Sequence, residues 1–291
     1  MIYFISKQTN LIKSELFEMS SLQHCFDYFK NKKEIEIDTE TEFCKWGKDR
    51  LPDPYTSKAL SLQLGDFNNQ YVIDLTTIAI LELSILNPLF INPEIVKIFC
   101  NAFFDLRYFN HWQIKINNIW DIFLVESCIY KGQTLPEGFR SLKGMSERYL
   151  GINRDKTIRG QIHYRGLDSA VIQYAAEDVQ YMGKIKEKQI EKINAFPINI
   201  QKYINLENRY VYDLSLMSYH GIYLDKLKWL KVSELNKLRQ IVLQNQMAAW
   251  LIQNRYYEFA TQGLFGPECS INWNSAKQVL PLLKKLGVNV F

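Results

Sequence analysis

The segment Glu34–Thr41, EIEIDTET, is the feature that most restricts the fold of this 291-residue chain. Its alternation of apolar and polar residues predicts a β-strand whose isoleucines share one face. Asp38 and Glu40 then share the other face at the end of the strand. Two ionised carboxylates this close repel each other unless a cation lies between them, and Mg²⁺ or Mn²⁺ prefers such oxygen ligands. Alone, the pair is also compatible with a solvated strand face, which Glu34 and Glu36 would extend.

Strand and helix patterns alternate along the rest of the N-terminal part. Helix caps are expected at Ser20 and Asn101, and a hairpin turn at Asn68 and Asn69, because asparagine tolerates positive φ. Three antiparallel strands followed by alternating helices and strands predict an α/β fold, with helices on the faces of a mixed sheet. The strands are expected at residues 2–5, 34–41, 59–67, 70–75, 96–100 and 119–121, and the helices at residues 20–29, 77–86, 102–112 and 121–130.

The C-terminal part is predicted to be mainly helical. A stretch around Pro197 has the composition of a linker, so we expect two domains, residues 1–195 and residues 196–291. The expected elements are a helix over residues 168–187, a linker over 193–200, continuous helix over 201–252, a turn-rich stretch at 261–274 and a last helix at 275–286.

The net charge of +4 is distributed unevenly between these two parts. Residues 196–291 hold 11 Lys and Arg against 6 Asp and Glu, whereas residues 1–195 hold 24 against 25. The second part therefore carries the excess positive charge, which suits a polyanionic partner such as a nucleic acid. A mildly basic, solvated surface is the alternative interpretation.

Several classes of protein are not indicated by the composition. No apolar run reaches the ~18 residues that a membrane span requires, and the N-terminus lacks the basic start and long apolar stretch of a secretory signal. Five scattered cysteines contain no CxxC pair, so neither a disulfide framework nor a cysteine zinc site is expected. We expect a cytoplasmic protein, or one of the host-cell cytoplasm if it is viral, with no membrane partner. No P-loop, GxGxxG or GxSxG motif occurs.

Two further fragments carry side chains suited to the same chemistry as Asp38 and Glu40. In the first, Asn101 would end a strand and cap a helix, with Asp105 one turn inside that helix. In the second, Tyr174 and Asp178 lie at positions i and i+4 of the helix expected over residues 168–187, so they share a face. Taken singly, each fragment is also compatible with an ordinary cap or with a core-edge tyrosine beside a surface aspartate.

Together the three fragments resemble the DEDD superfamily of 3′-5′ exonucleases, in the subgroup with a tyrosine in its third motif. The matching motifs are DTET at 38–41, NxxxD at 101–105 and YAAEDV at 174–179. The resemblance covers about residues 1–190 and implies the ribonuclease-H-like fold, a mixed five-stranded sheet flanked by helices. The segment at 147–151, followed by Asp155 and Lys156, resembles the ribonuclease D side of this superfamily.

The resemblance also implies roles for five residues. Asp38, Glu40, Asp105 and Asp178 would hold two divalent ions, Mg²⁺ or Mn²⁺, and Asp38 would bridge both. Tyr174 would orient the water that attacks the terminal phosphodiester. This is the two-metal, in-line displacement known for phosphoryl transfer.

Substrate contacts are expected next to these motifs. The resemblance implies that Thr41 and Glu40 hold the terminal 3′-hydroxyl and that Asn101 contacts the last nucleotide. Independently of it, Trp46 and its aromatic neighbours Phe43 and Tyr55 could stack on an unpaired base or pack under their own loop. The cations that precede the third motif could contact the phosphate backbone, namely Arg154, Lys156, Arg159 and Arg165.

A second resemblance covers part of the C-terminal third. Residues 205–230 resemble the start of the polymerase part of family A DNA polymerases, with the turn GIYLD at 221–225. Residues 271–278, INWNSAKQ, resemble a later segment of the same family, and in that family both segments belong to the thumb. This implies either an exonuclease with a thumb remnant or a fragment of a longer polymerase.

We therefore expect a metal-dependent 3′-5′ exonuclease that removes nucleotides from single-stranded or frayed DNA 3′ ends, as in proofreading. Its expected partners are DNA and, in addition, a DNA polymerase. A ribonuclease D-like exoribonuclease is one alternative. A non-catalytic DNA-binding module, or a piece of a larger polymerase, is another.

Overall fold

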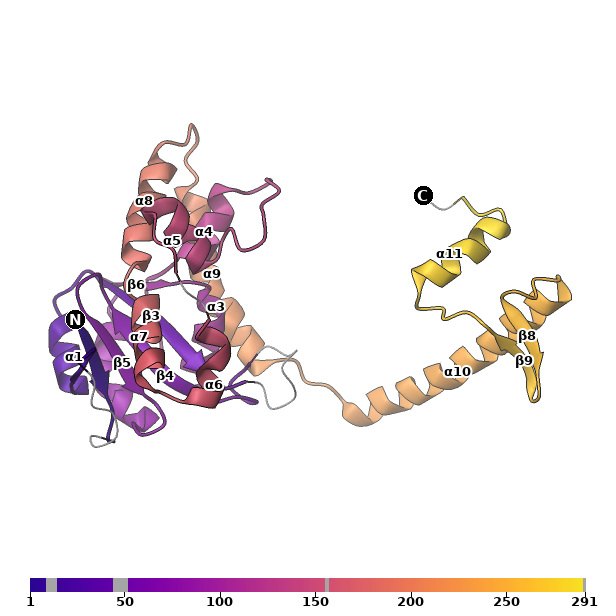
Figure 1. Cartoon of the computed structure of the whole chain (residues 1–291), viewed down its shortest axis with the longest axis horizontal. Coiled ribbons are helices and arrows are strands. Elements are labelled where there is room, and N and C mark those ends of the chain that lie inside the picture. Colours follow the sequence, from indigo (N-terminus) through magenta and orange to yellow (C-terminus); the bar gives the residue numbers. More distant parts are fainter. Residues whose placement is uncertain (9–14, 44–51, 155–156, 290–291) are drawn as a thin grey trace. The chain divides into compact units, whose positions relative to one another are not determined.

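A mixed sheet of seven strands, in the order β2-β1-β5-β4-β3-β6-β7, forms the centre of the N-terminal part (Figure 1). The computed structural model describes residues 1–8, 15–43, 52–154 and 157–289. Strands β3, β4 and β5 are antiparallel, β6 and β7 continue the sheet in parallel beyond β3, and β1 and β2 continue it in parallel beyond β5. The strands are β1 (Ile2–Ile5), β2 (Glu18–Met19), β3 (Glu34–Thr41), β4 (Ala59–Gly65), β5 (Gln70–Asp74), β6 (Val96–Phe99) and β7 (Ile119–Asp121).

Helices cover both faces of this sheet. On one face, Ile35 and Ile37 of β3 pack in the main core with Phe29 of α1 and Leu106 of α3. On the other face, Ile172 of α7 packs in a cluster that contains residues of β1 and β5. The helices of this part are α1 (Leu22–Phe29), η1 (Ile80–Leu86), α2 (Asn87–Ile91), α3 (Ala102–His111), α4 (Ile122–Ile129), α5 (Leu142–Leu150), η2 (Arg159–Gln161), α6 (Ile162–Arg165), α7 (Ser169–Asp178), α8 (Met182–Asn194) and α9 (Gln201–His220).

The hydrogen bonds at the cap of α1 and at the β4–β5 turn differ from the predicted ones. The cap of α1 is Ser21, whose hydroxyl accepts from the His24 amide at 3.1 Å, and the prediction of Ser20 was wrong by one position. The β4–β5 hairpin forms as predicted, but neither Asn68 nor Asn69 has a positive φ in the described structure. Instead, the carboxylate of Asp66 accepts hydrogen bonds from both asparagine amides at 2.9 Å, which closes the turn.

The helix predicted over residues 168–187 is two helices, α7 and α8. The carboxylate of Glu36 on β3 accepts hydrogen bonds from the amides of Met182 at 2.6 Å and Gly183 at 2.9 Å. These amides would otherwise point back along a continuous helix, so the contact starts a new helix and satisfies its N-terminal donors. Burial raises the pKa of Glu36 to about 7 in spite of the two donors. The preceding helix, α7, ends at Asp178.

The chain divides into two compact units, Met1–Gly221 and Ile222–Phe291. Helix α9 belongs to the first unit, where Ile204 is buried in a cluster with residues of α4. The first unit therefore extends beyond the domain boundary predicted at residue 195. The continuous helix predicted over 201–252 is interrupted at Gly221, which has φ 68°. The second unit consists of α10 (Lys226–Gln253), the hairpin β8 (Ala260–Gly263) and β9 (Gly266–Cys269), and α11 (Ala276–Lys285).

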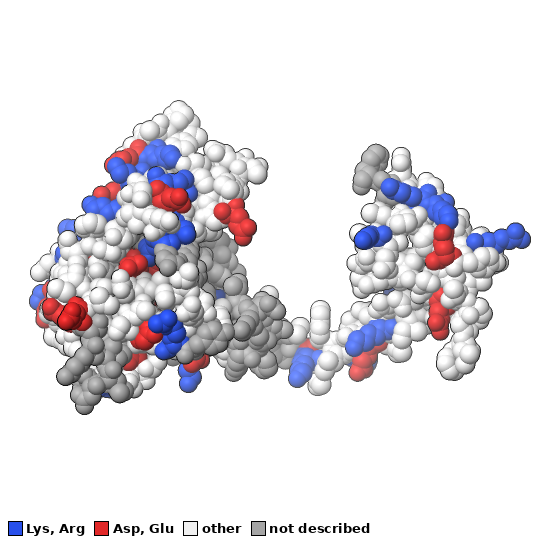
Figure 2. Space-filling model, viewed as in Figure 1, with Lys and Arg blue, Asp and Glu red and all other residues white. Residues whose placement is uncertain are grey.

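None of the helices in the described ranges is both long enough and apolar enough to cross a membrane. Charged side chains of both signs are interspersed on the visible face of the first unit (Figure 2). Helix α8 carries ion pairs between residues one helical turn apart, Lys184 with Glu187 and Lys188 with Glu191.

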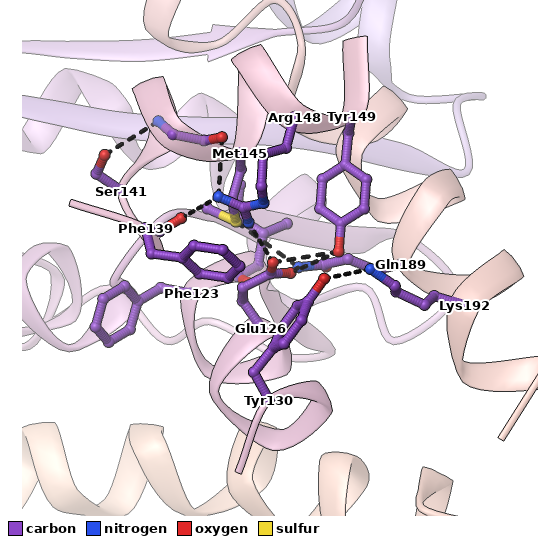
Figure 3. A network of polar contacts seen from close by, with 12 residues as sticks. Phe123, Glu126, Tyr130, Phe139, Ser141, Met145, Arg148, Tyr149, Gln189 and Lys192 are labelled. Carbon is purple, nitrogen blue, oxygen red and sulfur yellow. Dashed lines mark hydrogen bonds and ion pairs between the residues drawn. The ribbon is translucent and has the colours of Figure 1, made fainter. Parts of the chain in front are cut away.

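A buried carboxylate joins α4, α5 and α8 (Figure 3). Glu126 of α4 is fully buried and accepts from Arg148 at 2.5 Å and from the Tyr149 hydroxyl at 3.0 Å, both on α5. It also accepts from the side-chain amide of Gln189 on α8 at 3.0 Å. The guanidinium of Arg148 lies over the ring of Phe139, 3.5 Å from its centroid. This network holds α8, which is separated from α7 by three residues, against the rest of the fold.

We expect Glu126→Ala to lower the free energy of unfolding by about 3 kcal/mol, because it breaks a buried pair and leaves three donors without their acceptor. Urea denaturation measures the change. The matched control is Glu147→Ala on α5, where the glutamate is exposed, and its expected effect is below about 0.5 kcal/mol. Equal effects of the two substitutions would contradict the structural role of Glu126.

Candidate active site

Three carboxylates converge between β3 and the end of α7. Asp38, Glu40 and Asp178 each offer one carboxylate oxygen, and these three oxygens lie within 4.8 Å of one another. Asp38 and Glu40 are two residues apart on β3, so they point to the same face of the sheet. The register of β3 against β4 shifts between Glu40 and Thr41, so β3 has a β-bulge directly after Glu40.

Helix α7 is fixed at both ends in a way that sets the position of Asp178. At its start, the carboxylate of Asp168 accepts from the Val171 amide at 2.9 Å and caps the helix. At its end, the chain passes so close to β4 that a Cβ atom on Gly65 would lie 2.1 Å from the Val179 carbonyl oxygen. Gly65 therefore allows the end of α7 to approach the sheet.

Tyr174 is one helical turn before Asp178 and shares its face of α7. Its side chain is buried and packs in a small cluster with Leu60 of β4 and Ile162 of α6. Packing in the core therefore holds the phenol on the same side of α7 as the carboxylate of Asp178.

Asp105 lies outside the group of three carboxylates. It is buried in the first turn of α3, and its carboxylate accepts from the hydroxyl of Thr39 at 2.6 Å. Thr39 alternates with Asp38 and Glu40 along β3, so it belongs to the other face of the strand. Burial, with a contribution from the charge of Asp121, raises the pKa of Asp105 to about 7.

Asn101 occupies the predicted cap position of α3 in a left-handed conformation, with φ 71° and ψ 54°. Its side chain makes no capping hydrogen bond, so the predicted cap interaction was wrong. Asp121 provides it instead, because its carboxylate accepts from the amides of Asn101 at 2.9 Å and Ala102 at 2.8 Å. The same carboxylate caps α4 through the Phe123 amide at 2.9 Å. Burial raises the pKa of Asp121 to about 6.

The other predicted substrate contacts are placed as follows. Thr41 is half-buried at the bulge of β3. Arg165 is exposed and pairs at 2.7 Å with Asp168, the cap of α7. Trp46 and the side chain of Arg159 lie outside the described residues.

The sequence did not predict that three further side chains lie next to the carboxylates. Arg154 is buried and donates to Asp178 at 2.5 Å. Ser61 and Gln63 are buried on β4, opposite Glu40 and Asp38 respectively, and Gln63 donates to the Ser61 hydroxyl at 2.6 Å. The alternation of ALSLQLG was the available signal, since it places both polar residues on one face of the strand and the leucines on the other.

The group of donors fits a small divalent cation. All three converging ligands are carboxylates, and hard cations such as Mg²⁺ and Mn²⁺ prefer oxygen ligands. Next to them the Oε1 atom of Gln63 is buried without a hydrogen-bond partner in the described structure, so the same face retains an unused acceptor.

The sequence itself decides the family. A profile of a 3′-5′ exonuclease family matches residues 17–194, which is more than half of the chain. The chain belongs to this family of 3′-5′ exonucleases. The matched region contains the strand β3, which carries Asp38 and Glu40, and the two helices α3 and α7, which carry Asp105 and Asp178. No curated protein sequence matches the chain.

Solved structures show the same fold at low sequence identity. The catalytic core of RRP6 from Trypanosoma brucei is 15% identical, with a TM-score of 0.56 over 74% of this chain and 52% of that one. RNase D from Escherichia coli is 21% identical, with a TM-score of 0.53 over 69% and 49%. The exonuclease thus spans about half of each of these two chains. NrnC from Brucella melitensis, in a structure with bound Mg²⁺, is 16% identical, with a TM-score of 0.54 over 77% and 98%.

These similarities confirm the predicted ribonuclease-H-like α/β fold class. The structure corrects one detail, because the sheet has seven strands where the family resemblance implied five. Strands β1 and β2 are the additional ones, paired in parallel at the edge formed by β5.

We expect Gly65→Ala to disturb the site through the backbone, because the new methyl group would displace Val179 and with it the neighbouring Asp178. Overpacking of this kind costs about 1–3 kcal/mol of stability. The variant should need more Mn²⁺ for half-maximal binding in a titration of the protein with the metal. Gly160→Ala is the matched control, since a Cβ there meets nothing within 4 Å. An unchanged midpoint for Gly65→Ala would show that the approach of α7 to β4 does not set the metal ligands.

Proposed function

We propose that this chain is a metal-dependent exonuclease that hydrolyses the last phosphodiester bond at the 3′ end of a nucleic acid. The proposal rests on the convergence of Asp38, Glu40 and Asp178 in a chain of the 3′-5′ exonuclease family. Three carboxylates whose oxygens lie within 4.8 Å of one another repel each other, and a divalent cation relieves that repulsion. A structure of NrnC, which shares the fold, contains Mg²⁺.

Each residue of the site has a proposed role. Asp38, Glu40 and Asp178 would hold the metal, and Asp105 would serve a second ion from the first turn of α3. When bound, the divalent ions lower the pKa of the attacking water and neutralise charge at the phosphate. The phenol of Tyr174, on the same face of α7 as Asp178, would hydrogen-bond the water and orient it. Glu40 and Thr41, at the bulge of β3, would hold the terminal 3′-hydroxyl.

Substrate choice is the finer part of the proposal, and we favour DNA. The second unit holds nine Lys and Arg against four Asp and Glu, so it carries the positive excess of the whole chain, and several of these side chains are visible at its surface in Figure 2. Its similarity in sequence to a polymerase thumb supports a role in gripping a DNA backbone, with a DNA polymerase as a further partner. The first half of α10 carries the exposed apolar side chains of Leu227 and Trp229 beside the exposed basic ones of Lys226, Lys228 and Lys231, which suits such a role as well as a solvated helix.

RNA is the second candidate substrate. It is favoured by the similarity to RNase D from E. coli, whose structure is described as that of an exoribonuclease involved in structured RNA processing. Another structure of NrnC is described as bound to pGG. Because these similarities are below 25% identity, they support the fold and leave the choice between DNA and RNA to experiment.

The direct test uses 5′-labelled DNA and RNA oligonucleotides of one sequence, incubated with the protein and Mg²⁺ or Mn²⁺. We expect a ladder that shortens from the 3′ end on DNA and disappears with EDTA. Loss of an outer-shell partner of a metal lowers activity by about 10- to 100-fold. Asp38→Ala removes a proposed ligand itself, so it should lower the rate of cleavage by more than this. Glu187→Ala, an exposed acid on α8, is the matched control and should cleave at the wild-type rate.

The other outcomes of this assay are equally informative. A ladder on RNA alone would replace DNA by RNA as the substrate. No ladder on either would reject the enzyme and favour a nucleic-acid-binding module. An Asp38→Ala variant as active as the wild type would reject the metal site.

Tyr174→Phe should reduce the turnover number by roughly 10-fold, because it removes one hydrogen bond to the attacking water and no metal ligand. The affinity for Mn²⁺ should stay at the wild-type value in a titration without substrate. A loss of Mn²⁺ binding would show that the phenol supports the metal site and would remove its proposed role with the water.

A further inference from the structure

Arg154 is an unusual side chain for a loop position. It follows α5 in the segment 151–154, yet only 5% of its side chain is exposed. One terminal nitrogen, Nη2, donates to the Oδ1 atom of Asp178 at 2.5 Å. The other terminal nitrogen, Nη1, is buried and has no hydrogen-bond partner in the part of the chain that the structure describes. Arginines in the same region differ, since Arg165 is exposed and pairs with a helix cap.

A buried guanidinium with an unused donor is costly to keep. Buried donors without acceptors cost about 1–3 kcal/mol each, and a charged one costs more. An ion pair with Asp178 alone would use a single nitrogen, and a side chain that remains in water would make it at lower cost. The free Nη1 therefore indicates a second acceptor that arrives with a ligand.

The charge of the site indicates what this acceptor is. Asp38, Glu40, Asp178 and Asp105 together carry up to four negative charges, and two divalent ions would balance them. A phosphodiester brings one further negative charge, and more negative charge develops on its oxygens as water attacks. The planar fork of an arginine can hold a carboxylate with one nitrogen and a phosphate oxygen with the other.

We propose that Arg154 is a catalytic residue of this exonuclease: Nη1 binds a non-bridging oxygen of the scissile phosphate while Nη2 holds Asp178. The proposal rests on the exonuclease function proposed above. It assigns to a loop residue outside the three family motifs both the neutralisation of the phosphate and the orientation of the third carboxylate.

A binding experiment tests this contact without any hydrolysis. Two fluorescent DNA oligonucleotides are compared in Ca²⁺, one with an ordinary 3′-terminal phosphodiester and one with an uncharged methylphosphonate at that linkage. The wild type should bind the phosphodiester roughly 10- to 100-fold more tightly, as expected for a charge-assisted hydrogen bond. Arg154→Gln should lose most of this preference, and Arg140→Gln, a surface arginine on another loop, should keep it. An unchanged preference in Arg154→Gln would overturn the proposal.

Kinetics separate a phosphate contact from a purely structural role. At saturating Mg²⁺, Arg154→Gln should turn over roughly 10- to 100-fold more slowly, and millimolar guanidinium should restore part of the rate. If Arg154 only neutralises Asp178, the variant would bind Mn²⁺ more tightly than the wild type and turn over at the wild-type rate, which would overturn the proposal. Arg154→Lys keeps the charge but lacks the fork, so it covers the case in which the Gln variant does not fold, and it should show a smaller loss of the same kind.

The two proposals fail in different ways. A wild type that cleaves neither DNA nor RNA rejects the exonuclease function, whereas the methylphosphonate comparison still decides the role of Arg154. A wild type that cleaves, together with an Arg154→Gln variant of equal turnover and equal preference, rejects Arg154 alone.

Discussion

The carboxylate of Glu36 accepts hydrogen bonds from the first two amides of α8, and the position of the third motif relative to the sheet depends on this contact. Helix α7 ends at Asp178, four residues before the first of these amides, and Asp178 converges with Asp38 and Glu40 of the same strand. The acceptor lies two residues before Asp38 on the same face of β3, so one strand both anchors the helix break and supplies two of the converging carboxylates. Burial of Glu36 is unfavourable for its charged form, and the two amides offset part of that cost.

Around this anchor, the site concentrates groups that would be unfavourable elsewhere. Three carboxylates converge, a terminal nitrogen of the buried Arg154 has no hydrogen-bond partner among the described residues, and Asp105 is buried with its pKa raised to about 7. Sites of chemistry often retain such groups because the bound ligand satisfies them. These groups destabilise the folded protein. The Glu126 network and the close approach at Gly65 instead stabilise the helices that hold the site.

The sequence predicted those parts that depend on local pattern. The alternation of EIEIDTET placed Asp38 and Glu40 on one face of a strand, and the i, i+4 spacing placed Tyr174 and Asp178 on one face of a helix. It did not predict the break between α7 and α8, because Glu36, which binds the first amides of α8, lies on another element 146 residues before Met182. The ion pair of Arg154 was missed for the same reason, since a loop has no periodicity from which a partner can be read.

The remaining differences also arise from long-range contacts. Strand β1 was recognised, but its pairing with β5 and the two-residue strand β2 leave no trace in a local pattern. Asp121 caps α4, and it also binds the start of α3 from 19 residues away, which no rule for a single helix contains.

Helix α9 has a practical consequence for anyone who divides this protein. It buries Ile204 against α4, and its Asn208 accepts a hydrogen bond from the Asp121 amide at 2.7 Å. A truncated protein that ended with α8 would uncover these surfaces and would be prone to aggregation. Gly221, with its positive φ, is the point at which the first unit can be cut or fused to another protein while its core stays closed.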